Sequence, residues 1–522
     1  MTLDTALENA RIVDGTGAPW FRGAVGINDG EIARVSRTES IDDSAEERID
    51  LDGLTLCPGF VDTHSHSDLR LFEDPTVAPK TRQGITTEIL GQDGFSMAPM
   101  YRDGGAEEWE DHLSGLDGRT DREWTWGSVA DYFDAIDESG VAVNVGMLVG
   151  HGTVRFNVMG MDDRLPTEAE LEEMAGLVTE ALDAGAIGFS TGLIYTPQVH
   201  SDTEEVRRLA SRLAPYGRPF VAHIRNETDD IWAALDEFID IGVSENVPLH
   251  LSHFKLALPP QHGKAERAIE IIEAARERDV DFTADQYPYT AGSTMLAVVL
   301  PSWVRADGTE RAVEYLSDEE SRAEIRDAMT GRSEPWENTV VTSVASDSNA
   351  HLEGLNVEEI AEERGVDPVT AVMDLLREEH LEVSKITHML AERDVREILR
   401  YERATVATDG LFGGKPHPRT YGTYPRVLGH YVRDENLLSV EEAVRMMTSL
   451  PARAMGLQTK GIVRPGMDAD LVAFDPQSVG TSATFQSPRR HPDGMPHVIV
   501  DGEFVVRDHG LTDATPGRAI RK

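Results

Sequence analysis

The sequence predicts an α/β protein built around a TIM (β/α)8 barrel, with a smaller β-domain beside it. Three observations lead to this prediction. The chain has 522 residues, which exceeds the usual size of a single core. Short apolar runs alternate with longer amphipathic segments over most of its length. The two ends of the chain have a different, β-rich texture.

Eight short apolar runs are the expected barrel strands. Helix-forming segments with a helical spacing of apolar residues lie between several of them, notably 167–185, 205–217, 229–242 and 266–279. This alternation indicates βαβ units and a parallel sheet, and eight such units favour closure into a barrel. The expected strands are residues 54–62, 85–91, 141–150, 186–190, 219–224, 247–253, 279–286 and 404–409.

The seventh and eighth expected strands are far apart in the chain. The stretch between them contains a strand-like segment, 338–346, and a helix-like segment, 367–380. A long loop without structure is uncommon inside a compact domain. We therefore predict a subdomain of about 290–355, inserted between barrel strands 7 and 8.

Both ends of the chain contain short alternating strands with Asp-Gly turns. We expect residues 1–53 and 456–522 to pair into one small β-domain. Residues 54–455 then form the barrel domain. Cys57, the single cysteine, lies in an apolar run and is expected in the core.

The composition is strongly acidic, with 93 acidic against 49 basic residues and a formal net charge of −44. Such a chain is a poor partner for nucleic acid or an anionic membrane. The acids are spread along the helical segments, which favours a salt-adapted, halophilic surface over an ordinary acidic protein. No signal peptide or long apolar stretch is present, so we expect a cytoplasmic protein. The oligomeric state is left open.

Histidines and one aspartate follow four of the expected strands. His64 and His66 come at the end of the first strand, and their spacing of two places both on one face. His223 and His253 end later strands, and Asp409 ends the eighth. Active sites of TIM barrels lie at this end of the strands. Converging imidazoles are ligands of transition metals, and a carboxylate there could also accept a proton from metal-activated water.

Strand parity separates His250 from this set. His250 and His253 fall on opposite faces of their strand, whereas His253 and Lys255 share one. We therefore expect His250 to be structural. His151, after the third strand, is expected to have a structural role or to support a ligand.

These residues and their surroundings resemble the amidohydrolase superfamily, and within it the D-aminoacylase (N-acyl-D-amino-acid deacylase) family. The resemblance covers nearly the whole chain. It implies a metal-dependent-hydrolase TIM barrel, a small β-sandwich built from both termini, and hydrolysis of N-acyl-D-amino acids to a carboxylate and a free D-amino acid. It is carried by PGFVDTHSHSD, TRQGITTEILGQDGFSMAP, GAIGFSTGLIYTP, HIRNE, LSHFKLA, DQYPYTAGST, ATDG, PHPRTYGTYPRVLGHYVRD and GIVRPGMDADLVAFDP.

The resemblance also implies roles for individual residues. His223 and His253 would bind a tightly held zinc ion. His64, His66 and Asp409 would form a second, weaker or partial site, with Asp409 as the catalytic acid and base. The implied substrate-binding residues are Lys255, Tyr287 and Arg419, which would hold the substrate carboxylate, with Tyr195 and Ser293 nearby.

One residue departs from the family pattern. The family has a cysteine ligand in the turn after strand two, where this chain reads Gly91-Gln92-Asp93-Gly94. We therefore expect Asp93 to be a metal ligand, ahead of Glu88 and Glu227. A hard carboxylate should weaken the preference for zinc and make manganese, cobalt or a second ion easier to accept.

Two alternatives remain open at this stage. A cyclic-amide or D-dipeptide hydrolase is disfavoured, because such relatives carry a carboxylated lysine after strand four and this chain has none in AIGFSTG. A metal-free scaffold that keeps the fold without the chemistry is disfavoured by the intact set of candidate ligands.

Overall fold

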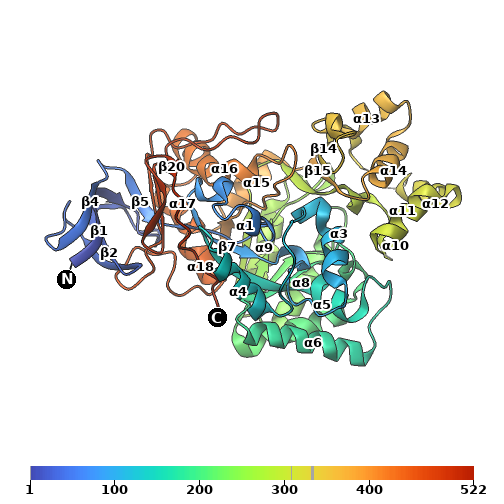
Figure 1. Ribbon diagram of the computed structural model, residues 1–522, viewed down its shortest axis with the longest axis horizontal. Coiled ribbons are helices and arrows are strands. Elements are labelled where there is room, and N and C mark those ends of the chain that lie inside the picture. The colour runs from blue at the N-terminus through green and yellow to red at the C-terminus, as the bar shows by residue number, and fades with distance from the viewer. Residues whose placement is uncertain (1, 307, 331–333) are drawn as a thin grey trace.

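The structure is a computed structural model that describes residues 2–306, 308–330 and 334–522. It contains the predicted barrel of eight parallel strands, each bonded to the next in sequence order (Figure 1). The strands are β6 (Phe60–Asp62), β7 (Ile85–Leu90), β8 (Asn144–Gly150), β9 (Gly188–Gly192), β10 (Phe220–His223), β11 (Leu249–Leu251), β12 (Phe282–Gln286) and β16 (Ala404–Val406).

Amphipathic helices follow the strands and pack around them, as their apolar spacing requires. Several begin at side-chain caps; Thr167, for example, forms a capping box with Glu170 at the start of α6. The principal helices are α3 (Gly105–Asp117), α4 (Val129–Ser139), α5 (His151–Met159), α6 (Glu168–Asp183), α7 (Thr203–Ala210), α8 (Ile231–Glu245), α9 (Ala265–Arg276), α15 (Glu392–Leu399), α16 (Arg419–Arg426), α17 (Val440–Met447) and α18 (Ser449–Ala454).

The expected first strand, 54–62, is two strands that belong to different sheets. Its first half is β5 (Thr55–Pro58), which pairs with the terminal strands, and its second half is β6 of the barrel. The chain changes sheet at Gly59, where an added Cβ would lie 2.1 Å from Thr86 Oγ1. Only glycine permits this close approach.

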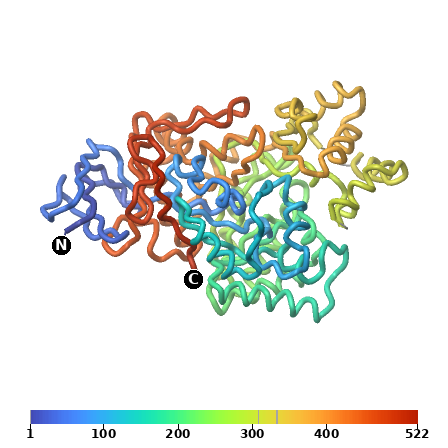
Figure 2. The backbone as a smooth tube through the Cα atoms, viewed as in Figure 1, coloured from blue at the N-terminus to red at the C-terminus, as the bar shows by residue number. Residues whose placement is uncertain are grey.

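The terminal segments form one nine-stranded sheet beside the barrel, and Figure 2 shows the first and last parts of the chain next to each other. The long β1 bonds β2 along one edge and β4 and then β5 along the other, and β17 joins the C-terminal strands to β5. Its strands are β1 (Thr2–Ile12), β2 (Phe21–Asn28), β3 (Glu31–Ser36), β4 (Ser44–Asp50), β5, β17 (Leu471–Phe474), β18 (His497–Val500), β19 (Glu503–Arg507) and β20 (Gly510–Leu511).

The predicted insertion of about 290–355 is too short. A separate three-stranded antiparallel sheet has the order β13-β15-β14, so the insertion extends to the end of β15. The sequence pattern missed this because β15 lies far along the chain from its partner β13. The insertion consists of β13 (Ala291–Met295), α10 (Ser302–Arg305), α11 (Thr309–Ser317), α12 (Glu319–Thr330), β14 (Thr339–Val344), α13 (Val357–Arg364), α14 (Pro368–Glu378) and β15 (Val383–His388).

The barrel closes between its first and last strands without a regular ladder. A single bridge joins Ser65 to Gly410, and the Asp409 amide donates to the His64 carbonyl at 2.9 Å. This contact between the segments after β6 and β16, the seam of the barrel, therefore brings the first and last candidate ligands together.

A buried lysine lies beneath this seam. Lys80 Nζ is 2.8 Å from Asp62 Oδ2, 2.8 Å from Ser65 Oγ, 2.6 Å from Thr408 Oγ1 and 3.0 Å from Glu88 Oε1. All five side chains are fully buried. The network links the first, second and eighth barrel strands directly below the candidate site.

No helix among the described residues is long and apolar enough to cross a membrane.

Candidate metal centre

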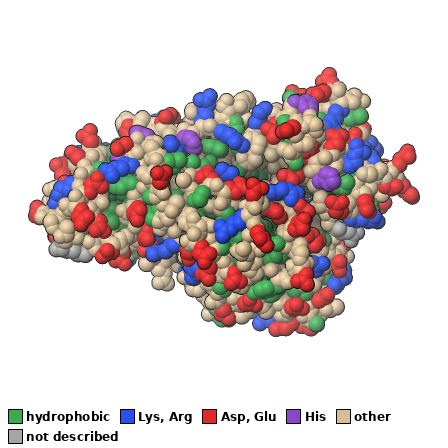
Figure 3. Space-filling model, viewed as in Figure 1, with side chains coloured by type: hydrophobic (Ala, Val, Ile, Leu, Met, Phe, Trp, Pro, Cys, Tyr) green, Lys and Arg blue, Asp and Glu red, His purple; other side chains and the backbone are tan. Residues whose placement is uncertain are grey.

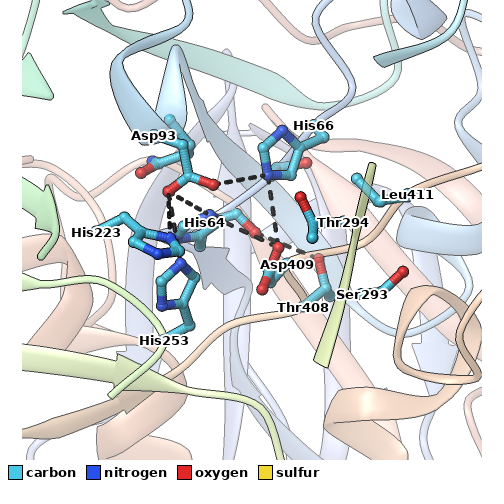
Figure 4. A network of polar contacts seen from close by, with 12 residues as sticks. His64, His66, Asp93, His223, His253, Ser293, Thr294, Thr408, Asp409 and Leu411 are labelled. Atoms are coloured by element: carbon cyan, nitrogen blue, oxygen red, sulfur yellow. Dashed lines mark hydrogen bonds and ion pairs between the residues drawn. The ribbon is translucent and has the colours of Figure 1, made fainter. Parts of the chain in front are cut away.

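Six side chains predicted to bind metal meet at the carboxyl end of the barrel (Figure 4). None is more than 5% exposed. They come from the segments after five different strands, so no short stretch of chain contains the site. They are His64 and His66 after β6, Asp93 after β7, His223 at the end of β10, His253 after β11 and Asp409 after β16.

Three of these residues have left-handed backbone conformations. The φ angles are 56° for Asp93, 35° for His253 and 47° for Asp409. Such conformations are disfavoured for residues other than glycine and concentrate at functional sites. Each residue lies just beyond a short strand, in a turn that redirects its side chain towards the centre.

Asp93 reaches both halves of the cluster. Its Oδ1 lies 3.5 Å from His253 Nε2, 3.7 Å from His223 Nδ1 and 3.7 Å from His64 Nε2. Its Oδ2 lies 3.8 Å from His66 Nε2. Donor atoms about 2.0–2.2 Å from one zinc ion lie roughly 3.3–3.6 Å apart. The contacts in the cluster are therefore close to the spacing of ligands around an ion and longer than hydrogen bonds.

Asp409 completes the second half of the cluster. Its Oδ1 lies 3.7 Å from His64 Nε2 and 3.5 Å from His66 Nε2. The sets His64–His66–Asp409 and His64–Asp93–His253 each have three donor atoms within 4.8 Å of one another. His64 belongs to both sets, so the two groups form one continuous cluster.

Several donor atoms of the cluster have no hydrogen bond to any described residue. Both ring nitrogens of His64 and of His223, the Nε2 of His66 and the Oδ1 of Asp93 are buried without a hydrogen bond. Buried polar atoms normally have partners. A bound cation would satisfy these atoms, so the residues present fit a metal ion.

Electrostatics within the cluster favour positive charge at its centre. Burial would lower the pKa of His64, but the charges of Asp409 and Asp93 raise it well above its usual value. Burial also opposes the charged form of His66, yet its bond to Asp117 raises the pKa to about 9. In contrast, burial lowers the pKa of His223 to about 4, which leaves a neutral imidazole suited to a metal.

Asp285 supports the cluster from below and was not identified from the sequence. Its Oδ2 lies 2.9 Å from His250 Nε2 and 3.8 Å from His64 Nδ1, and its Oδ1 accepts from the His253 amide at 2.6 Å. His250 is thus oriented by Asp285 and Thr283 and lies outside the ligand set, as parity predicted. The sequence feature that could have identified Asp285 is the presence of a carboxylate near the end of the seventh expected strand.

Asp117, at the end of α3, was also missed. Its Oδ1 lies 3.1 Å from His66 Nδ1, so it orients His66 while Nε2 faces the cluster. No local pattern marks this residue, because α3 precedes the third strand and reaches His66 only through the fold.

The rival residues occupy different positions. Glu88 accepts hydrogen bonds from Ser65 and Ser67 beneath the cluster. His151 is bonded to Thr191 and Glu205, consistent with a structural role.

Glu227 lies closer to the cluster than Glu88. Its carboxylate is 3.6 Å from His223 Nε2, 3.1 Å from His253 Nδ1 and 2.6 Å from Lys255 Nζ. It contacts the outer nitrogens of both histidines, whereas Asp93 contacts the inner ones. Lys255 Nζ is also 2.6 Å from His253 Nδ1.

Arg419 and Tyr287 lie on the other side of the cluster. Arg419 Nη1 pairs with Asp409 Oδ2 at 2.9 Å, and its guanidinium lies 4.4 Å from the centroid of the Tyr287 ring. The Tyr287 hydroxyl is buried without a hydrogen bond among the described residues. Burial would raise the pKa of Asp409, but Arg419 and His64 hold it below its usual value.

The strand β13 passes over this region. Tyr195 Oη lies 3.0 Å from Thr294 Oγ1, and Figure 4 shows Thr294 on the side of its strand that is turned towards the cluster. Ser293 lies on the opposite side of its strand; its hydroxyl donates to the Lys385 carbonyl and its own carbonyl accepts from Arg419. The hydroxyl facing the cluster therefore belongs to Thr294, one residue after the expected Ser293, because side chains alternate along a strand.

Comparison with known proteins gives consistent matches over the chain. The model of the amidohydrolase family matches residues 47–506. The D-aminoacylase of Alcaligenes xylosoxydans xylosoxydans is 34% identical over 520 residues, covering 99% of this chain and 98% of the relative. The N-acyl-D-glutamate deacylase of the same organism is 34% identical over 521 residues, covering 100% and 97%.

Solved structures give the same result. The N-acyl-D-glutamate deacylase of Bordetella bronchiseptica, in complex with zinc and a phosphonate mimic of the tetrahedral intermediate, matches with a TM-score of 0.86 at 34% identity. A D-aminoacylase studied for its binuclear metal centre matches with a TM-score of 0.85 at 34% identity. Both alignments cover 100% of each chain.

The support from Asp285 can be tested with the substitution Asp285→Asn. The amide keeps the size of the carboxylate but loses its charge and one acceptor, so we expect zinc affinity to fall about 10- to 100-fold. Competition with a chelator measures this affinity. Asp281→Asn, at an exposed position just before β12, is the matched control. Equal affinities in the two variants would contradict the assigned role.

Proposed function

Because this chain belongs to the amidohydrolase family, we propose that it is a metal-dependent hydrolase of N-acyl-D-amino acids. The reaction adds water across the amide bond and yields a carboxylate and a free D-amino acid. One observation carries the proposal: a buried cluster of His and Asp, with several ring nitrogens that bond no described residue, lies beside Arg419 and the Tyr287 hydroxyl, which also bonds none of them.

The cluster has the donors for one or two divalent ions. His223 and His253, with Asp93 Oδ1 at 3.7 Å and 3.5 Å from their ring nitrogens, would hold one ion, and His64, His66 and Asp409 a second. Glu227 also forms a group of three possible ligands with His223 and His253. Zinc is the proposed metal, with manganese or cobalt as alternatives. When bound, such an ion lowers the pKa of water and polarises the scissile carbonyl.

Asp409 is the proposed acid and base. Its low pKa keeps it ionised, so it can accept a proton from the attacking water. Cleavage of the carbon–nitrogen bond needs a proton on the departing nitrogen, and the same carboxyl group would supply it. Arg419 holds Asp409 in place through their 2.9 Å ion pair.

The substrate carboxylate is assigned to Arg419, Tyr287 and Lys255. The planar guanidinium suits a carboxylate, and the Tyr287 hydroxyl is a free donor among the described residues. Lys255 lies across the cluster, held by Glu227 and His253. Fixing the carboxylate at a distance from the metal decides which enantiomer presents its amide to the ions.

The role of Asp409 can be tested with Asp409→Asn. We expect kcat to fall at least about 10²- to 10⁴-fold, because the amide cannot transfer the proton. The assay is release of D-amino acid from an N-acetyl-D-amino acid, with the fold checked by circular dichroism. The exposed Asp434→Asn is the control. A variant at position 409 with full activity would overturn the assignment.

We further propose that Asp93 would bind an ion in either half of the cluster. Its Oδ1 lies 3.5 Å from His253 Nε2 and 3.7 Å from both His223 Nδ1 and His64 Nε2, while its Oδ2 lies 3.8 Å from His66 Nε2. A carboxylate within reach of both halves can hold two ions at once. It is also a harder ligand than the cysteine it replaces.

Asp93→Cys tests this idea through metal content. After dialysis against equal zinc and manganese, we expect the ratio of bound zinc to manganese to rise severalfold in the variant, because a thiolate prefers zinc. Asp513→Cys adds a thiol at an exposed position and is the control. An unchanged ratio in Asp93→Cys would show that Asp93 does not bind the ions.

The acidic surface supports a further proposal, that the protein works in a salt-rich cytoplasm. Figure 3 shows acidic side chains over most of the visible face. With a net charge of −44, mutual repulsion destabilises the folded state at low ionic strength.

Thermal unfolding in KCl tests the salt adaptation. Raising KCl from about 0.1 M to about 1 M shortens the screening length from roughly 10 Å to roughly 3 Å. We expect the unfolding midpoint to rise over this range. A midpoint that stays constant or falls would remove the halophilic interpretation.

A further inference from the structure

One face of the inserted sheet borders the proposed substrate site. On β13, Thr294 Oγ1 lies 3.0 Å from Tyr195 Oη, beside the metal cluster (Figure 4). Two residues earlier on the same face is Gly292, where an added Cβ would lie 3.4 Å from the Tyr287 hydroxyl. The face that carries Gly292 and Thr294 therefore lies against the residues assigned to the substrate.

The neighbouring strand β15 continues this face. Thr294 pairs with Lys385 and Gly292 pairs with Thr387 in the antiparallel ladder. Paired residues in such a ladder place their side chains on the same face. Lys385 and Thr387 therefore lie one strand away from the residues that border the site, a distance of about 5 Å.

Lys385 is a buried cation with little to neutralise it. Lys385 is 8% exposed. Its only side-chain hydrogen bond to a described residue is from Nζ to Thr387 Oγ1 at 3.2 Å. Burial lowers its pKa, and Glu334 opposes this only from a distance. No carboxylate of the described residues comes within 4.0 Å of Nζ. Buried lysines are normally paired, so this position lacks an anion.

The ammonium group extends along its own strand to Thr387, whose hydroxyl also contacts Thr339 on β14. On one side Lys385 pairs with Val341, which is fully buried, and Val383 precedes it on the same face; both belong to the apolar core of the insertion. On the other side is Thr387, which pairs with Gly292 next to Tyr287. The bond to Thr387 shows that Nζ extends to this polar side.

We propose that Lys385 binds the side-chain carboxylate of the substrate, so that N-acyl-D-glutamate and N-acyl-D-aspartate are preferred over neutral N-acyl-D-amino acids. This inference rests on the proposed function. Lys385 is the cross-strand neighbour of Thr294 and lies diagonally across the ladder from Gly292, the position next to the Tyr287 hydroxyl. Overall sequence identity does not distinguish an acidic from a neutral substrate side chain, because the chain is 34% identical both to a D-aminoacylase and to an N-acyl-D-glutamate deacylase.

Kinetics of the metal-loaded, full-length enzyme test the inference. N-acetyl-D-glutamate is compared with N-acetyl-D-glutamine, which has nearly the same shape without the charge, and with N-acetyl-D-leucine. We expect the wild type to favour glutamate over glutamine about 10- to 100-fold in kcat/KM, the usual range for a buried charged hydrogen bond. In Lys385→Met this preference should disappear, mainly through a higher KM for glutamate, while glutamine and leucine change little.

Two controls separate a specificity role from a structural one. Lys415→Met makes the same change at an exposed lysine near the insertion and should keep the preference for glutamate. Lys385→Gln keeps most of the side-chain length and serves if the methionine variant fails to fold.

The possible failures are distinguishable. If the wild type hydrolyses N-acetyl-D-leucine or N-acetyl-D-glutamine as well as N-acetyl-D-glutamate, or if Lys385→Met and Lys385→Gln keep the preference, the inference is wrong and the proposed function stands. If the metal-loaded enzyme hydrolyses no N-acyl-D-amino acid, the proposed function fails and the inference fails with it.

Discussion

The candidate site depends on the closure of the barrel between its first and last strands. A regular ladder is absent there, and the buried Lys80 holds the seam through Asp62 and Thr408. The fully buried ammonium is stable because two carboxylates and two hydroxyl groups surround it. Without this closure, His64 and Asp409, which lie at opposite ends of the barrel sequence, would not share one centre.

Above the seam, the site collects more negative charge than its own residues neutralise. Asp93, Asp409 and Asp285 all face the histidine rings, and several ring nitrogens have no partner among the described residues. This imbalance favours a cation, either a proton on His64 or a metal ion. Asp117 bonds the His66 ring and Asp285 bonds the His253 backbone amide, so both histidines are held in place before an ion binds.

The inserted sheet contacts the barrel close to the candidate site. Its strands β13 and β15 lie over the mouth, with Thr294 against Tyr195 and Lys385 one strand further out. The barrel supplies chemistry through residues that follow its strands, whereas the insertion supplies side chains that can change without disturbing the metal ligands.

The sequence by itself determined the alternation of strands and helices, the types of the ligands and their order along the chain, because periodicity and residue chemistry are local properties. It also identified Asp93 as a carboxylate in a cysteine's position. Only the tertiary structure decided that strand one divides at Gly59, that the insertion extends to β15, that Asp285 contacts the histidines of the site, and that Lys385 is buried beside Thr294. These features depend on contacts between distant segments, and a buried carboxylate or lysine has no local pattern that shows what it will meet.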